Sequence, residues 1–430
     1  MAGEDFIQFI WKHRLYKGDP LQTTCGQELR VLHPGEQNDH SGPDFFNARI
    51  RLKHLIWAGN VEVHQRASDW YRHGHHIDPA YNNVILHVVG AHDSDIYNSL
   101  GRRIHTLVPD YPTSLVQRYK ALKKNEDWLP CGSYIKDFPA PGLKQCLSRL
   151  QVQRTFQKSQ RFDALYPGIR KEKKEESLYK ALASGFGLPL NSLPFELLSK
   201  GIPYGEVNKF RDNLFDLEAL FFGHSGLLYP ARKMGSYPSS LWERYTELRD
   251  HLPGNPLPPH LWKFLRLRPA SFPTLRISQF ASILHQNIPL VNSIQSIVSL
   301  TELEQILRAS SSTYWDTHYL FGKCSAPFPK FLGQQSVAKL IINVIIPFLN
   351  ALDRIEPGRK YGPMAEEIFS QMKSESNQVI EKFREHGIHV KNARESQALL
   401  QLFNVYCKQK RCLNCQIGIG LLEAAIHEKK

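Results

Sequence analysis

Two strand-like stretches joined by a two-residue turn, within residues 45–65, constrain the fold more than any other feature of the sequence. Phe45–Leu52 and Leu55–Gln65 are rich in apolar and aromatic residues, and Lys53-His54 separates them. Stretches of this composition and spacing are typical of a β-hairpin. The sequence therefore predicts two neighbouring strands, on each of which residues two apart share a face.

The segments around this hairpin predict a mixed α+β fold. Residues 1–13 carry apolar side chains at helical spacing, and Glu28–Leu32 is a short strand candidate. Val84–Val89 is nearly continuous apolar sequence, as expected of a strand buried on both faces. Ser68–Asn82 is polar and helix- or loop-like, and Arg103–Val108 is a last strand candidate. The predicted order is helix, three strands, short helix, then one or two strands.

The rest of the chain has a different character. Beyond the strand-rich segment, apolar positions recur at helical spacing and are interrupted by proline-rich loops. A chain of 430 residues is also long enough for two domains. We therefore expect an α/β domain over residues 1–135 and a mainly helical domain over residues 136–430.

The charge balance favours a polyanionic partner. The chain has 54 Lys and Arg residues against 41 Asp and Glu residues, a formal net charge of +13. Cationic surfaces attract phosphate groups and release counterions on binding. Nucleic acid is therefore the expected partner, and no small-molecule cofactor is evident. The alternative is a solvated basic surface without a ligand.

Hydropathy and cysteine usage favour a cytoplasmic location. The longest apolar run, around Ala338–Leu349, is interrupted by Asn343 and Pro347, so no membrane span is expected. The N-terminal residues do not resemble a signal peptide. Seven cysteines, four of them scattered, argue for a reducing compartment rather than a secreted disulfide framework.

A candidate catalytic site lies on the predicted hairpin. Asp44 opens one strand, while Glu62 and His64 lie two residues apart on its partner and so face the same side. Two carboxylates suit Mg²⁺ or Mn²⁺, and the metal lowers the pKa of bound water. His64 would then position or deprotonate that water. The alternative is that Asp44 caps a strand and that Glu62 and His64 form an ordinary polar face.

These residues resemble the signature of the PD-(D/E)xK nuclease superfamily. Pro43-Asp44 matches its first part, and Glu62-Val63-His64 matches its acid-x-Lys part with histidine in place of lysine. The resemblance implies a restriction-endonuclease-like α-β-β-β-α-β core and a metal bound by Asp44 and Glu62. A further glutamate often joins such sites, and we expect Glu36 to do so in preference to Glu28. Gln65 and Arg66 are expected to contact phosphate.

A histidine-rich segment follows the hairpin. His73 and His75 or His76, with Asp78, have donor atoms suited to a transition metal, although their spacing matches no closed zinc site. An exposed polar loop is the more common reason for such a segment. His87, inside the apolar strand candidate, is expected to be a satisfied core histidine or to face the same pocket as Glu62.

Three cysteines near the C-terminus form a second candidate metal site. Cys407, Cys412 and Cys415 have C-x4-C-x2-C spacing with Lys and Arg beside them. The run resembles the iron–sulfur loop of helix-hairpin-helix DNA glycosylases, which implies Zn or an Fe–S cluster. Because no cysteine follows Cys415, a fourth ligand would come from Cys324, Cys131 or a histidine, or be absent. The alternative is a helical turn with reduced thiols.

Three arginines in the helical part could contact phosphate. Arg266, Arg268 and Arg276 lie close together in the sequence, and arginine is suited to bidentate phosphate or carboxylate contacts. Salt bridges to Glu218 or Glu196 account for them equally well.

Several longer phrases resemble one bacterial family throughout the chain. They include GPDFFNARI, WAGNVEVH, DWYRHGHHIDPAYNNVILHVV, RLRPASFPTLR and YCKQKRCLNCQIG. On these the chain is similar to the family catalogued as domain of unknown function 2851, which implies a bacterial cytoplasmic protein. The leading hypothesis is a divergent metal-dependent nuclease. A catalytically inactive nucleic-acid-binding protein and a scaffold without a nucleic-acid partner are the alternatives.

Overall fold

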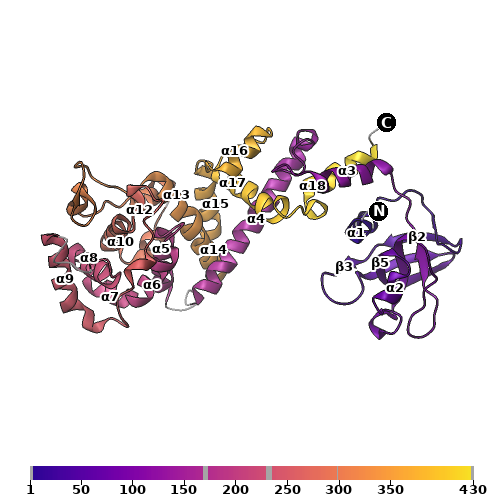
Figure 1. Ribbon diagram of the computed structural model, residues 1–430, viewed down its shortest axis with the longest axis horizontal. Helices are drawn as coiled ribbons and strands as arrows, with labels where there is room; N and C mark the ends of the chain where they lie inside the picture. The colour runs from indigo at the N-terminus through magenta and orange to yellow at the C-terminus, as the bar shows by residue number, and fades with distance from the viewer. Residues whose placement is uncertain (1–2, 168–172, 229–234, 298, 428–430) are drawn as a thin grey trace. The chain divides into compact units, whose positions relative to one another are not determined.

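The computed structural model describes residues 3–167, 173–228, 235–297 and 299–427, and they form a mixed α+β structure with two compact units (Figure 1). Unit 1 comprises Met1–Leu147, Glu381–Ile388 and Leu399–Lys430, and unit 2 comprises Ser148–Ile380 and His389–Ala398. The boundary expected at residues 135 and 136 therefore lies inside unit 1. The C-terminal cysteines belong to the same unit as the strand-rich segment.

The sheet of unit 1 has strand order β1-β2-β4-β5-β6-β7, and β3 pairs with β4. Neighbours from β1 to β5 are antiparallel, while β5, β6 and β7 are parallel. The strands are β1 (Leu21–Gln22), β2 (Glu28–His33), β3 (Glu36–Gln37), β4 (Phe45–Leu52), β5 (Leu55–Arg66), β6 (Val84–Ala91) and β7 (His105–Leu107).

The β4–β5 hairpin turns at Lys53 and His54, as its sequence predicts. Lys53 has a left-handed backbone with φ of 52°, which two-residue hairpin turns require. The register of the pair shifts by one residue between Ala48↔Gly59 and Phe45↔Val61. Asn47, with φ of 56°, lies in this bulge. The shift places Asp44, just before β4, opposite Glu62.

Helix α1 (Glu4–His13) covers one face of the sheet. Ile7 and Trp11 are buried against a cluster that includes Phe45, Val61 and Val63. The Trp11 indole donates a hydrogen bond to the Pro34 carbonyl oxygen at 2.9 Å. The apolar spacing of the first residues therefore produces a helix whose buried side packs on the strands.

The other face of the sheet packs against the segment between β5 and β6. Helix α2 (Asp69–Arg72) places Trp70 in a second cluster with Tyr81 and Val89. Because β5 and β6 are parallel, this segment is a crossover connection. Glu62, His64 and His87 are buried between these strands and the crossover.

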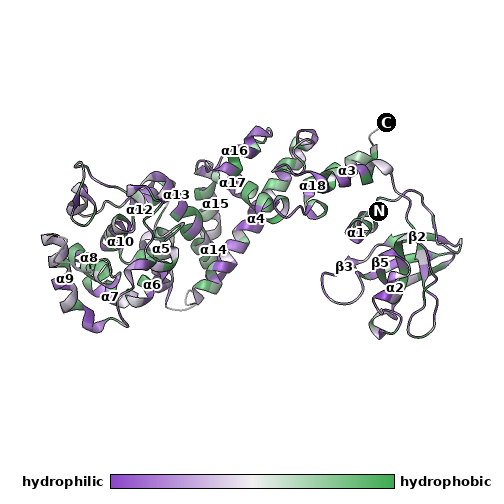
Figure 2. Ribbon diagram, viewed as in Figure 1, coloured by the Kyte–Doolittle hydropathy of each residue, from purple (hydrophilic) through white to green (hydrophobic). Residues whose placement is uncertain are grey.

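The C-terminal segment completes unit 1. Helix α18 (Gln416–His427) is mostly hydrophobic and packs on α3 (Thr113–Lys124) (Figure 2). Ser114 Oγ donates a hydrogen bond to the Ala425 carbonyl oxygen at 2.7 Å. Phe6 of α1 stacks on Tyr119 of α3 with ring centroids 4.5 Å apart. Residues more than 300 positions apart thus share one core, which is why a single cut near residue 135 does not describe the unit.

Helices make up most of unit 2, and its core centres on α8 and α10, of which nearly every residue is buried. The helices beyond α3 are α4 (Ala140–Leu165), which begins in unit 1, α5 (Lys174–Phe186), α6 (Ser192–Gly201), α7 (Tyr204–Phe210), α8 (Leu214–His224), α9 (Ser236–Leu248), α10 (Pro273–Asn287), α11 (Leu290–Gln295), α12 (Leu300–Leu307), α13 (Gln334–Leu340), α14 (Ile346–Ile355), α15 (Tyr361–Gln371), α16 (Gln378–Glu385), which ends in unit 1, and α17 (Ala393–Gln401). A small two-stranded sheet joins β8 (His318–Leu320) and β9 (Lys323–Cys324).

One helical run of unit 2 has the length and hydropathy of a membrane span. It extends over Gln334–Ile355, and 67% of its most apolar window is buried inside the structure. Buried core helices commonly have these properties, so the run is weak evidence for a membrane.

The buried carboxyl group of Glu218 predicts a pH dependence of stability. It accepts hydrogen bonds from Tyr237 Oη and, at 2.9 Å, from Ser312 Oγ. Burial raises the pKa of Glu218 above its ordinary value of 4.5. The folded protein therefore keeps a proton that the unfolded chain releases, and the stabilisation is complete below pH 4.5 and is lost as the pH rises through the folded pKa.

Glu218→Gln is expected to remove this dependence, since the amide does not ionise. Above pH 4.5 the wild type should lose up to about 1.4 kcal/mol of unfolding free energy per pH unit relative to the variant. Hydrogen exchange of backbone amides in α8 and α10 at a series of pH values, corrected for the intrinsic pH dependence of exchange, measures this. Parallel profiles for the two proteins would show that Glu218 is ionised in the folded state.

Candidate metal centre

Asp44 and Glu62 meet across the β4–β5 pair. The Asp44 backbone N–H donates to Glu62 Oε2 at 3.0 Å, and the Val63 N–H donates to Asp44 Oδ2 at 2.9 Å. Each carboxylate therefore accepts a hydrogen bond from the partner strand. The register shift described above makes this exchange possible, because an unshifted hairpin would pair Asp44 with Val63 instead.

The environment of the two acids opposes their ionisation. Burial, followed by the charge of Glu62, raises the pKa of Asp44. Burial also raises the pKa of Glu62. The first helix adds two polar groups. Gln8 hydrogen-bonds the Asp44 side chain. Burial, followed by the charge of the nearby Asp44, raises the pKa of Glu4. Buried carboxyl groups gathered in this way are typical of sites that bind a cation.

The imidazoles of His64, His73 and His75 form a cluster beside Glu62. His64 Nε2 lies 3.1 Å from His73 Nδ1 and 3.6 Å from Glu62 Oε1. His75 Nε2 lies 3.3 Å from the same Glu62 oxygen. One nitrogen of each of His64, His73 and His75 lies within 4.8 Å of the others. The strand β5 and the segment after α2 thus bring three imidazole nitrogens together, with Glu62 Oε1 beside two of them.

Three of the distances among these atoms are close to the edges of a tetrahedral metal site. With metal–nitrogen and metal–oxygen bonds of about 2.0–2.1 Å, the edges of a tetrahedron measure about 3.3–3.4 Å. Three distances lie around that value: 3.1 Å between His64 Nε2 and His73 Nδ1, 3.3 Å between His75 Nε2 and Glu62 Oε1, and 3.6 Å between His64 Nε2 and Glu62 Oε1. Imidazole nitrogens favour transition metals such as Zn²⁺ and Fe²⁺ over Mg²⁺, which prefers oxygen.

Surrounding groups hold the histidines in position. His64 Nδ1 lies 2.7 Å from His87 Nε2, so one ring donates to the other within the buried strands. Burial lowers the pKa of His64 and of His87 well below the ordinary value, which keeps both rings neutral. The His75 ring stacks on Tyr81 with centroids 3.8 Å apart. A neutral imidazole whose second nitrogen is hydrogen-bonded is the usual form of a metal ligand.

Solvent reaches the candidate centre at His73 and Asp44. Glu62, His64 and His75 are buried, Asp44 is half-buried and His73 is exposed. A ligand would therefore approach past His73 and Asp44.

The structure places the other expected site residues of unit 1 differently. Glu36 is exposed on β3, and among the described residues its carboxylate has no recorded bond to Asp44 or Glu62. Gln65 and Arg66 are exposed at the end of β5. The Asp78 side chain accepts a hydrogen bond from the Ala80 N–H, which caps a short 3-10 helix.

Sequence reasoning missed Glu4 and Gln8. The sequence does contain a pattern that predicts their shared position. Residues four apart on a helix lie on the same face, and the polar Glu4 and Gln8 flank the buried Phe6 and Ile7. His73 and His75 were considered as ligands, but without Glu62 and His64. No spacing rule predicts that His64 on β5 meets His73, which lies nine residues later in a loop.

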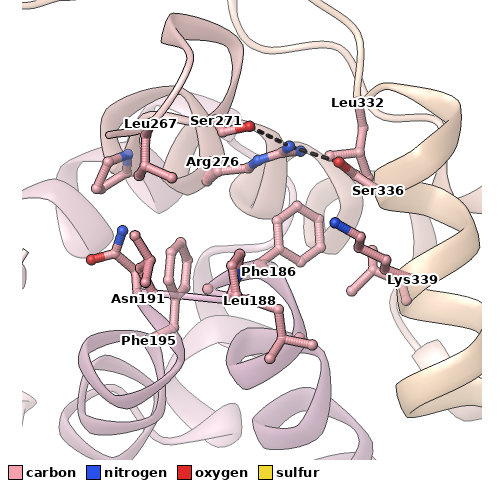
Figure 3. A pocket seen from close by; sticks show the side chains of 16 residues that line it. Phe186, Leu188, Asn191, Phe195, Leu267, Ser271, Arg276, Leu332, Ser336 and Lys339 are labelled. Atoms are coloured by element: carbon pink, nitrogen blue, oxygen red, sulfur yellow. Dashed lines mark hydrogen bonds between the residues drawn. The ribbon is translucent and has the colours of Figure 1, made fainter. Parts of the chain in front are cut away.

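The three arginines that the sequence singles out as phosphate contacts lie in two kinds of place, the surface and a cavity. Arg266 and Arg268 are exposed. Arg276 is buried and lines a cavity of about 80 Å³, where it donates to Ser336 Oγ at 2.7 Å and to Ser271 Oγ at 3.5 Å (Figure 3). Burial lowers the pKa of its guanidinium to about 10.

Comparisons with known proteins identify the family. Neither the curated proteins nor the solved structures include a match to this chain. A family model described as "Protein of unknown function (DUF2851)" matches residues 4–378, which include the metal centre and most of unit 2. The chain therefore belongs to the DUF2851 family.

Proposed function

We propose that unit 1 is a metal-dependent phosphodiester hydrolase of the nuclease type. The observation that carries this proposal is the cluster of imidazole nitrogens from His64, His73 and His75, with Glu62 Oε1 3.3 and 3.6 Å from two of them and the carboxyl group of Asp44 beside it. A metal bound by such donors lowers the pKa of a bound water and stabilises charge on a reacting phosphate.

The order of elements supports this proposal. Helix α1, the antiparallel strands β2, β4 and β5, helix α2 and the parallel strand β6 follow one another in the chain. This order agrees with the α-β-β-β-α-β core that the Pro43-Asp44 and Glu62-Val63-His64 resemblance implies. We assign unit 1 to that class of fold as part of the proposal.

The proposal gives Asp44 and His64 separate roles. His64 is 1% exposed and both of its nitrogens face other side chains, so it is suited to bind the metal rather than to take a proton from water. Asp44 is half-buried at the open side and its pKa is raised, which strengthens it as a proton acceptor near neutral pH. Gln8 orients the Asp44 carboxylate through its hydrogen bond.

A basic cavity beside the centre favours a polyanionic substrate. The cavity has a volume of about 490 Å³ and Gln8 lies in its wall. Lys12, Lys123, Lys410 and Arg411 also line it. Lysine and arginine side chains bind phosphate groups, and the net charge of +13 acts in the same direction at longer range. We therefore propose nucleic acid as the substrate.

Metal dependence of cleavage tests the proposal. The protein should cleave single- or double-stranded DNA or RNA, and Mn²⁺ or Zn²⁺ should support cleavage better than Mg²⁺ because imidazoles supply most of the ligands. Absence of cleavage with every metal would overturn the hydrolase. Binding that weakens steeply with salt would then favour a nucleic-acid-binding protein without activity, and no binding would favour a scaffold.

Asp44→Asn is expected to lower the cleavage rate by about 10²- to 10⁴-fold, the range typical of a lost general base. Bound metal per chain should stay unchanged, because Asp44 is not among the four converging donors. Glu126→Gln, at an exposed position after α3, is the matched control and should behave like the wild type. Loss of the metal together with the activity would instead make Asp44 a ligand.

A further inference from the structure

The chain reverses direction between Cys407 and Cys412. A π-helical turn (Leu402–Cys407) ends at Cys407, and Lys410 then adopts a left-handed conformation with φ of 51°. The Arg411 N–H donates to the Tyr406 carbonyl oxygen at 2.9 Å, which closes the turn. This reversal brings Cys412 back toward the helix end that carries Cys407.

Cys412 and Cys415 are held at the start of α18. Cys412 opens a 3-10 turn (Cys412–Asn414), and the Cys415 N–H donates to the Cys412 carbonyl oxygen at 3.3 Å. A Cβ added to Gly418 would lie 2.2 Å from that carbonyl oxygen, so glycine is required for α18 to approach the turn. The N–H groups of Ile417 and Gly418 donate to the Cys415 sulfur. Burial raises the pKa of the Cys415 thiol, and these N–H donors act in the opposite direction.

Cys131 approaches from a different part of unit 1. It lies just before a 3-10 helix (Ile135–Asp137) that contacts α18. Cys131, Cys407 and Cys415 are buried, and Cys412 is half-buried. Cys131 lies among the groups close to Cys407, and Cys412 and Cys415 lie close to both. Four mutually neighbouring thiols thus come from two segments about 280 positions apart.

We propose that Cys131, Cys407, Cys412 and Cys415 bind a metal through four thiolates. All four are free cysteines, and soft thiolate ligands select Zn²⁺ or an Fe–S cluster. Lys408, Lys410 and Arg411 are exposed beside the site, and their charge offsets that of the thiolates. The site fastens the C-terminal segment to the loop after α3. Its ligands are distinct from those of the histidine centre, although Cys412, Lys410 and Arg411 also line the basic cavity described above.

The remaining cysteines of unit 1 and unit 2 differ in their surroundings. Cys25 and Cys324 are exposed, and neither is among the groups that shift the pKa of the four thiols. Cys146 is buried and lies near Cys407. Cys25 therefore offers a matched control within the same unit.

Metal analysis of the full chain, purified without oxygen, tests the site. Cys131→Ser and Cys412→Ser are compared with Cys25→Ser, all in a Glu62→Gln background so that metal at the histidine centre is not counted. We expect Cys25→Ser to retain metal and the other two to lose it, with affinity at least about 100-fold lower, since even outer-shell changes weaken binding 10- to 100-fold. One zinc in a colourless protein identifies a zinc site, whereas iron with sulfide and visible absorption identifies a cluster.

Thiol labelling keeps the test decisive if a variant folds poorly. In the unsubstituted chain, a maleimide reagent should label the exposed Cys25 and Cys324 at once and the four clustered thiols only after a strong chelator is added. Cobalt(II) added to chelated protein should produce thiolate-to-metal absorption. Metal content that is the same in Cys131→Ser and Cys25→Ser, or labelling that a chelator does not change, would overturn the proposal.

Discussion

Glu62→Gln is expected to empty the histidine centre and abolish cleavage. Glu62 Oε1 lies 3.6 Å from His64 Nε2 and 3.3 Å from His75 Nε2, so its charge is central to the site. An amide of the same shape leaves three imidazoles without a carboxylate. Metal affinity should fall by at least about 100-fold, because changes outside the ligand shell already cost 10- to 100-fold.

Competition with a metal-binding dye measures this affinity, and cleavage is assayed in parallel. Glu126→Gln is again a suitable comparison, since Glu126 is exposed after α3 and is not among the residues of the cluster. It should change the metal affinity by less than tenfold. A Glu62→Gln protein with wild-type metal affinity would refute the centre, even if activity were lost.

Trp11→Ala is expected to destabilise unit 1 more than any other single truncation on α1. Trp11 is 0% exposed, packs on the sheet beside Phe45 and Val61, and donates to the Pro34 carbonyl oxygen. Removing a buried tryptophan side chain typically costs about 3–5 kcal/mol, from lost apolar burial and the cavity left behind. The unpaired Pro34 oxygen adds to this cost.

Hydrogen exchange of backbone amides in β4 and β5 is the suitable measurement, because unfolding of a two-unit chain is not two-state. Where exchange follows unfolding of the unit, a loss of 3–5 kcal/mol corresponds to exchange faster by about 10²- to 10⁴-fold. Trp57→Ala is the control, since Trp57 is 40% exposed on β5. Equal effects of the two substitutions would show that α1 does not secure the sheet.

Local pattern sufficed for the strands that position the centre. β4 has the predicted bounds, and β5 and β6 extend the predicted ranges by one and two residues. Their composition and the two-residue turn act over short distances, so they can be seen in sequence. Two very short strands, β1 and β3, were not predicted, because two residues carry no periodicity.

The pairing of Asp44 with Glu62 depends on one feature that the sequence does not predict. Counting back from the turn at Lys53 and His54 pairs Asp44 with Val63, and only the bulge at Asn47 brings Asp44 opposite Glu62. A shift of one residue exchanges the faces of a strand, so the candidate site depends on it. Asparagine tolerates the left-handed backbone of that bulge better than most residues.

The sequence by itself determined the mixed α+β character, the hairpin, the basic charge and the residue types that can bind a metal, because each depends on composition or on neighbours along the chain. Tertiary structure alone decided that His73 and His75 join Glu62 and His64, that Glu4 and Gln8 face Asp44, and that Cys131 joins the C-terminal cysteines. These groupings depend on strand register and on how helices pack across the sheet. Such contacts join residues far apart in the chain, and no local spacing specifies them.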